Sequence, residues 1–154
     1  MNKILILALS LIIDFLIPNI TLYSFNNITY FFPMATVISL IFIDDYKLIL
    51  ISSIIYGALY TGNIVLSITL FFLISIFCYI YRKYFMKNLI TIILQILIVI
   101  FLYDFLYFLI YSFVYNQFIW NNLFYKVSHS LITNIIYGTT LYRLTLKRSS
   151  KLNY

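Results

Sequence analysis

One apolar stretch, residues 89–115, constrains the fold of this chain more than any other feature. Asp104 is its single charged residue. Because a helix rises about 1.5 Å per residue, the stretch is long enough to cross a hydrocarbon layer roughly 30 Å thick. The basic cluster Arg82, Lys83 and Lys87 precedes it, whereas residues 116–122 after it carry no charge. Since basic residues collect in cytoplasmic loops, this span is predicted to run from the cytoplasm outward.

The composition predicts a membrane protein. Of the 154 residues, 64% are hydrophobic and only 9% are charged, whereas a soluble domain carries about 25% charged residues. So few charges cannot cover a surface that faces water. The net charge of +6 comes from basic residues at the ends of apolar stretches, where they set topology and touch lipid headgroups. We therefore expect the lipid bilayer, and no nucleic acid, as a partner.

Six apolar segments predict one all-α transmembrane domain, a compact bundle of about six helices over residues 1–154. The second segment is short and opens with Pro33, so it is predicted to be a thin or tilted crossing. Gly62-Asn63 predicts a tight turn between the third and fourth segments. The predicted spans are residues 4–23, 31–43, 48–61, 64–81, 89–115 and 123–144.

The basic residues support this topology. With both termini in the cytoplasm of a bacterial cell, nine of the ten lysines and arginines are cytoplasmic and only Lys126 is not. If the third and fourth segments formed one re-entrant element instead, Lys47 and the Arg82 cluster would lie on opposite sides. The first segment is expected to be a retained helix and not a signal peptide, because Asp14 interrupts it and no small-residue cleavage site follows.

Two stripes of small or polar residues, spaced by four, are candidates for close helix packing. Such spacing lets helix backbones approach within a membrane, either inside the bundle or against the helix of a partner. The stripes are Ser53, Gly57 and Thr61 in the third span and Ser130, Asn134 and Gly138 in the sixth.

Asp14 and Asp104 are the acids within predicted spans. A carboxylate in hydrocarbon costs on the order of 3 kcal/mol or more, so each is expected to face protein, to be protonated or to be paired. The candidate donors are the tyrosines, Asn134, His129 and Lys126. A hydrogen-bonded structural acid, or one used against a partner subunit, is favoured over a proton or ion pathway.

Tyrosines recur at every fourth residue of the fifth span, at Tyr103, Tyr107, Tyr111 and Tyr115. Because a phenol requires a hydrogen-bond acceptor, this face is predicted to point into protein or toward the outer interface. Core packing is the favoured explanation.

The sequence contains no constellation for catalysis. Cys78 is the only cysteine and His129 the only histidine, so neither a disulfide nor a cysteine–histidine metal site is expected. There is also no glycine-rich phosphate loop and no nucleophile with a plausible base. We expect neither enzymatic activity nor a cofactor.

Several short stretches, in order along nearly the whole chain, resemble the rod-shape-determining MreD family. They are IDFLI from Ile13, FFPMATVISLI from Phe31, IIYGALYTGNIVL from Ile54, LFFLI from Leu70, LYDFL from Leu102 and LFYKVSHSLITNIIYG from Leu123. One departure concerns Gly57, which stands where many relatives have an aspartate after a tyrosine.

The resemblance implies a non-catalytic scaffold of the bacterial cell-elongation machinery. Such proteins bind the membrane-anchored MreC and thereby link the MreB filament to RodA and its transpeptidase, which regulates cell shape and peptidoglycan synthesis. The expected docking surfaces are the small face of the third span, the aromatic outer end of the fifth span, and Phe118, Trp120 and Phe124.

Two alternatives remain open. The MreD fold is similar to the substrate-binding S component of energy-coupling-factor vitamin transporters, which supplies the first. That function implies an Ala-x-x-x-Ala contact in the first helix, but Ala8 has Ile4 and Ile12 four residues away. The second alternative, an ion or proton channel, depends on Asp14 and Asp104 alone.

Overall fold

The computed structural model describes the backbone of residues 3–24, 34–85, 88–115 and 120–149. Side chains are described for residues 3–17, 34–85, 88–114, 127–128 and 130–145. Within these ranges every regular element is helical, as predicted. The elements are α1 (Lys3–Ser24), α2 (Ala35–Ser39), the 3₁₀ turn η1 (Leu40–Phe42), α3 (Tyr46–Tyr56), the π-helical turn η2 (Gly57–Thr61), α4 (Ile64–Tyr84), α5 (Leu89–Tyr115) and α6 (Trp120–Ser149).

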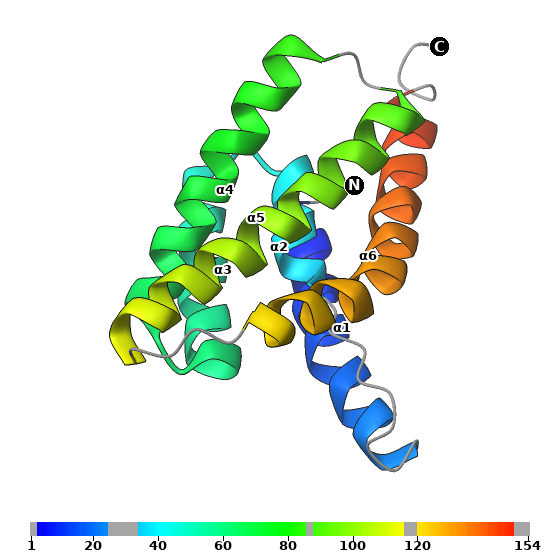
Figure 1. Ribbon diagram of the computed structural model, residues 1–154. Coiled ribbons are helices and arrows are strands. Elements are labelled where there is room, and N and C mark those ends of the chain that lie inside the picture. The colour runs from blue at the N-terminus through cyan, green and yellow to red at the C-terminus, as the bar shows by residue number, and fades with distance from the viewer. Residues whose placement is uncertain (1–2, 25–33, 86–87, 116–119, 150–154) are drawn as a thin grey trace.

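The helices form a bundle around α2 (Figure 1). α3 packs against α4, and α5 packs against both α4 and α6. α2 contacts α1, α5 and α6, so it lies at the centre. The lower part of α1, drawn in blue, projects beyond the other helices.

α4 and α5 are each long and apolar enough to cross a membrane. They contain 21 and 27 residues and coincide with the predicted fourth and fifth spans. α1 and α6 contain 22 and 30 residues and cover the predicted first and sixth spans.

The predicted second span differs most from the structure. Its helical part comprises only α2 and η1, and residues 31–33 lie outside the described part of the chain. Five α-helical and three 3₁₀ residues extend about 14 Å, less than half of a hydrocarbon core. Residues 34–41 are all buried. The described part of this segment is therefore a short, buried central helix.

Side-chain caps fix the starts of α3 and α4. The Asp45 carboxylate accepts the backbone N–H of Lys47 at the start of α3, and the Asn63 amide oxygen accepts that of Leu66 at the start of α4. Gly62 has a φ of 66°, a left-handed conformation that costs glycine little. The predicted turn at Gly62-Asn63 is thus present, and it makes α3 and α4 an antiparallel pair.

The outside of the bundle is more apolar than the surface of a soluble domain, and its interior combines a hydrophobic core with buried polar groups. Large apolar side chains cover the outside of the bundle, among them Val65 and Phe113, which are both 74% exposed. In soluble proteins such side chains are mostly inside, and contiguous exposed apolar surfaces are small. Among the residues whose side chains are described, the interior holds twelve buried polar residues beside its hydrophobic core: Ser10, Asp14, Thr36, Ser39, Ser52, Ser53, Ser67, Gln95, Asp104, Ser112, Ser130 and Asn134.

Candidate functional site: a buried polar centre at the start of α2

The interior is organised around the N-terminus of α2. The first N–H groups of a helix have no partner within it, and a buried helix start requires acceptors from elsewhere. Asp14 of α1 supplies two of them. Its Oδ1 accepts the backbone N–H of Ala35 at 2.7 Å, and its Oδ2 accepts that of Thr36 at 2.8 Å. Both carboxylate oxygens are therefore engaged by the start of α2.

Asn134 of α6 supplies a third acceptor. Its Oδ1 accepts the backbone N–H of Met34 at 2.7 Å. Its own amide nitrogen donates to the Ser130 carbonyl, also at 2.7 Å, which fixes the orientation of the side chain. Two helices distant in sequence thus cap the same short helix from either side.

Hydroxyl groups tie the surrounding helices to this centre. The Ser10 hydroxyl donates to the Ile6 carbonyl at 2.7 Å, so the Tyr137 hydroxyl, at 2.6 Å, must donate to Ser10. The Tyr60 hydroxyl donates to the Leu11 carbonyl at 2.7 Å. We call Ser10, Asp14, Asn134, Tyr137 and the backbone of residues 34–36 the polar centre.

Asp104, the other acid within a predicted span, is also buried. It is 1% exposed and neighbours Tyr103, whose ring meets that of Tyr56 edge-on at 6.4 Å. Tyr56 is itself buried. Asp104 is thus buried next to Tyr103, whereas both carboxylate oxygens of Asp14 accept backbone N–H groups of α2.

The predicted tyrosine stripe leads from the core to the surface. Tyr103 is buried, Tyr107 is partly buried and Tyr111 is 44% exposed. Successive ring centroids lie 6.4 and 6.3 Å apart, with the planes within 18° and 17° of parallel. The stripe thus points into protein at one end and outward at the other.

The small face of the predicted third span packs against α4. A Cβ atom at Gly57 would lie 2.7 Å from the Ile64 Cα, which is backbone and cannot rotate away. Ser53 is fully buried, and the Thr61 hydroxyl lies 2.8 Å from that of Ser67. This face is therefore an internal helix contact and is not open to a partner.

Gly138 occupies a close approach between three helices. A Cβ atom there would collide with Ile96 of α5 and would lie 3.1 Å from Ile38 of the α2 segment. Asn134 bonds the backbone of Met34, and Ser130 is fully buried, so the small face of α6 is directed into the bundle.

Two features were missed by sequence reasoning. The donors that engage Asp14 are the backbone N–H groups of Ala35 and Thr36, and the nearby Pro33 was the available signal for a helix start. Gln95 is 1% exposed, and its amide atoms have no hydrogen-bond partner among the described residues. A lone glutamine within the apolar run of α5 was the signal for that buried polar group.

The described residues contain no group of three or more histidine, cysteine, aspartate or glutamate side chains that could hold a metal ion. The side chains of Lys126 and His129, and those of the predicted docking residues Phe118, Trp120 and Phe124, lie outside the described residues. Comparisons of this chain with protein families, curated proteins and solved structures found no match. The polar centre is chemically a helix cap, with a carboxylate and an amide held by backbone groups.

Proposed function

We propose that this chain is a multi-pass protein of a bacterial cell membrane, with both termini in the cytoplasm. The apolar outside of the bundle carries this proposal: large exposed apolar side chains cover a bundle that also buries the polar centre. In lipid, backbone N–H groups must find acceptors inside the protein, and Asp14 and Asn134 provide them for the buried start of α2.

We further propose that it acts as a non-catalytic scaffold of the cell-elongation machinery, as the resemblance to the MreD family implies. Its direct partner is then an MreC-like membrane-anchored protein, and its indirect partners are MreB, RodA and the associated transpeptidase. The engagement of Asp14 by backbone N–H groups supports a structural role for this acid over ion conduction.

The outer end of α5 is the best available docking surface. Three docking surfaces were predicted. The small face of the third span is covered by α4, and the side chains of Phe118, Trp120 and Phe124 lie outside the described residues. Phe113 and Val114, near the end of α5, are 74% and 66% exposed. Exposed aromatic side chains often anchor helix and protein interfaces.

Co-purification tests this function. The tagged chain is extracted from the membranes of its own host in mild detergent, and the MreC homologue is quantified in the eluate. We expect MreC to co-elute, and we expect Phe113→Ala to reduce its recovery by about tenfold if the aromatic ring is an anchor. Ile90→Ala is the matched control, because Ile90 is 75% exposed at the opposite end of the same helix.

The outcomes separate the functions. Normal MreC recovery with Phe113→Ala would refute the α5 surface and leave the scaffold in place. A bound vitamin in place of MreC would contradict the scaffold and support the S component of a vitamin transporter.

A further inference from the structure

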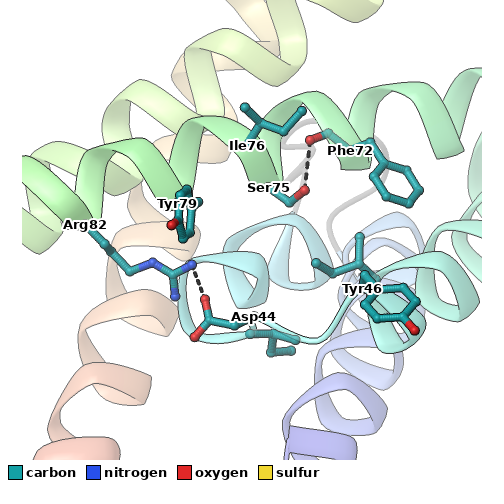
Figure 2. Close-up of a pocket in the computed structure, with 9 residues that line it drawn as sticks. Asp44, Tyr46, Phe72, Ser75, Ile76, Tyr79 and Arg82 are labelled. Atoms are coloured by element: carbon teal, nitrogen blue, oxygen red, sulfur yellow. Dashed lines mark hydrogen bonds and ion pairs between the residues drawn. The ribbon is translucent and has the colours of Figure 1, made fainter.

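An open groove lies between the start of α3 and the second half of α4. It has a volume of about 280 Å³. Its walls include the apolar side chains of Ile43, Ile49, Phe72 and Ile76, and Ser75 lies along the α4 side (Figure 2). Its lining is apolar enough to receive part of an aliphatic chain.

An ion pair between Arg82 and Asp44 closes one end of the groove. The Arg82 guanidinium also donates to the carbonyls of Ile41 and Cys78, each at 3.2 Å. Because a guanidinium has five N–H groups, two remain for a further acceptor. The Asp44 side chain is 60% exposed, so its carboxylate is accessible from outside. The end of the groove therefore presents one cation and one anion side by side.

This end lies at the depth of lipid headgroups in the proposed membrane placement. Arg82 is 18 residues after Ile64, the first residue of α4, which corresponds to about 27 Å and nearly the thickness of the hydrocarbon core. Tyr46 and Tyr79, which also line the groove, are 66% and 65% exposed. Exposed tyrosines are typical of the interface between hydrocarbon and water.

We propose that the groove binds one phospholipid with a phosphoethanolamine headgroup. An acyl chain lies along Ile49, Phe72 and Ile76, the phosphate accepts the remaining N–H groups of Arg82, and the primary ammonium donates to Asp44. An anionic headgroup matches the site less well, because Asp44 offsets the attraction of Arg82. A choline headgroup matches it less well because its quaternary ammonium has no N–H to donate. The inference depends on the membrane placement proposed above, but not on the scaffold function.

Lipid competition in nanodiscs tests the inference. The full chain is reconstituted with equal amounts of phosphatidylethanolamine, phosphatidylcholine and phosphatidylglycerol that share the same acyl chains, and the retained lipid is counted by native mass spectrometry. We expect about tenfold preferential retention of phosphatidylethanolamine, the size of effect that one charge-assisted hydrogen bond provides. Equal retention of the three lipids, preference for phosphatidylglycerol, or a protein bound in the groove would overturn the proposal.

Two variants locate the binding. Ser75→Phe places a ring in the groove and is expected to abolish the preference. Thr69→Phe is its control, because Thr69 is an exposed residue of the same helix, outside the groove, whose hydroxyl likewise bonds a carbonyl of its own helix.

Asp44→Asn is expected to remove the preference for phosphatidylethanolamine over phosphatidylcholine. An unchanged preference in Ser75→Phe would refute the site. A chain that fails to enter nanodiscs at all would instead refute the membrane placement.

Discussion

Asp14 is the residue on which the interior depends most. Burying a carboxylate is costly, so its location inside the bundle follows from sequence and physical chemistry alone. Its partners do not follow, because every non-proline residue carries the same backbone N–H and only the fold brings those of Ala35 and Thr36 to the carboxylate. For the same reason the contact of Asn134 with Met34 was not predictable, although Asn134 itself was a candidate.

Substituting Asp14 by asparagine tests its role as a cap. The amide retains one acceptor but turns an NH₂ group toward an N–H of α2, so we expect a loss of about 2 kcal/mol in the free energy of unfolding. Unfolding in mixed micelles measures it. Asp45→Asn makes the same change in a partly exposed acid that caps α3, and we expect a loss below about 1 kcal/mol there. Equal losses in both variants would contradict the special role of Asp14.

At the scale of elements, the long helices were predictable and the short ones were not. Apolar length and flanking charge located α4 and α5, and Gly62-Asn63 located the turn before α4. The hydrophobic run of residues 31–43 indicated burial but could not indicate how much of it is helical. The π-helical turn η2 was also unforeseen, because it depends on the packing of Gly57 against α4.

Because of that packing, the contact between α3 and α4 does not tolerate a larger side chain at Gly57. In Gly57→Leu the new side chain meets the backbone of Ile64, so we expect a loss of about 3 kcal/mol or more in the free energy of unfolding. Ala58→Leu adds a leucine at the next residue, which is exposed, and is expected to change stability by less than about 0.5 kcal/mol. A Gly57→Leu protein as stable as the Ala58→Leu control would show that the two helices do not approach closely at Gly57.

At the scale of the whole molecule, the packing of the helices brings two charged segments to the same end of the bundle. The ion pair between Asp44 and Arg82 brings the start of α3 and the end of α4 to one end of the bundle. The sequence prediction required this arrangement, because it assigned the residues around Lys47 and the Arg82 cluster to the cytoplasmic side. The Gly62-Asn63 turn lies at the other end of the α3–α4 pair and is therefore expected outside the cell.

Mapping the topology in living cells tests the central claim most directly. Reporters that are active on only one side of the membrane are fused at the N-terminus, at the C-terminus and within the Gly62-Asn63 turn. The account predicts that both terminal reporters are cytoplasmic, that the reporter in the turn is external, and that all three proteins are recovered with the membrane fraction. Terminal reporters on opposite sides of the membrane, or a chain recovered in the soluble fraction, would contradict it.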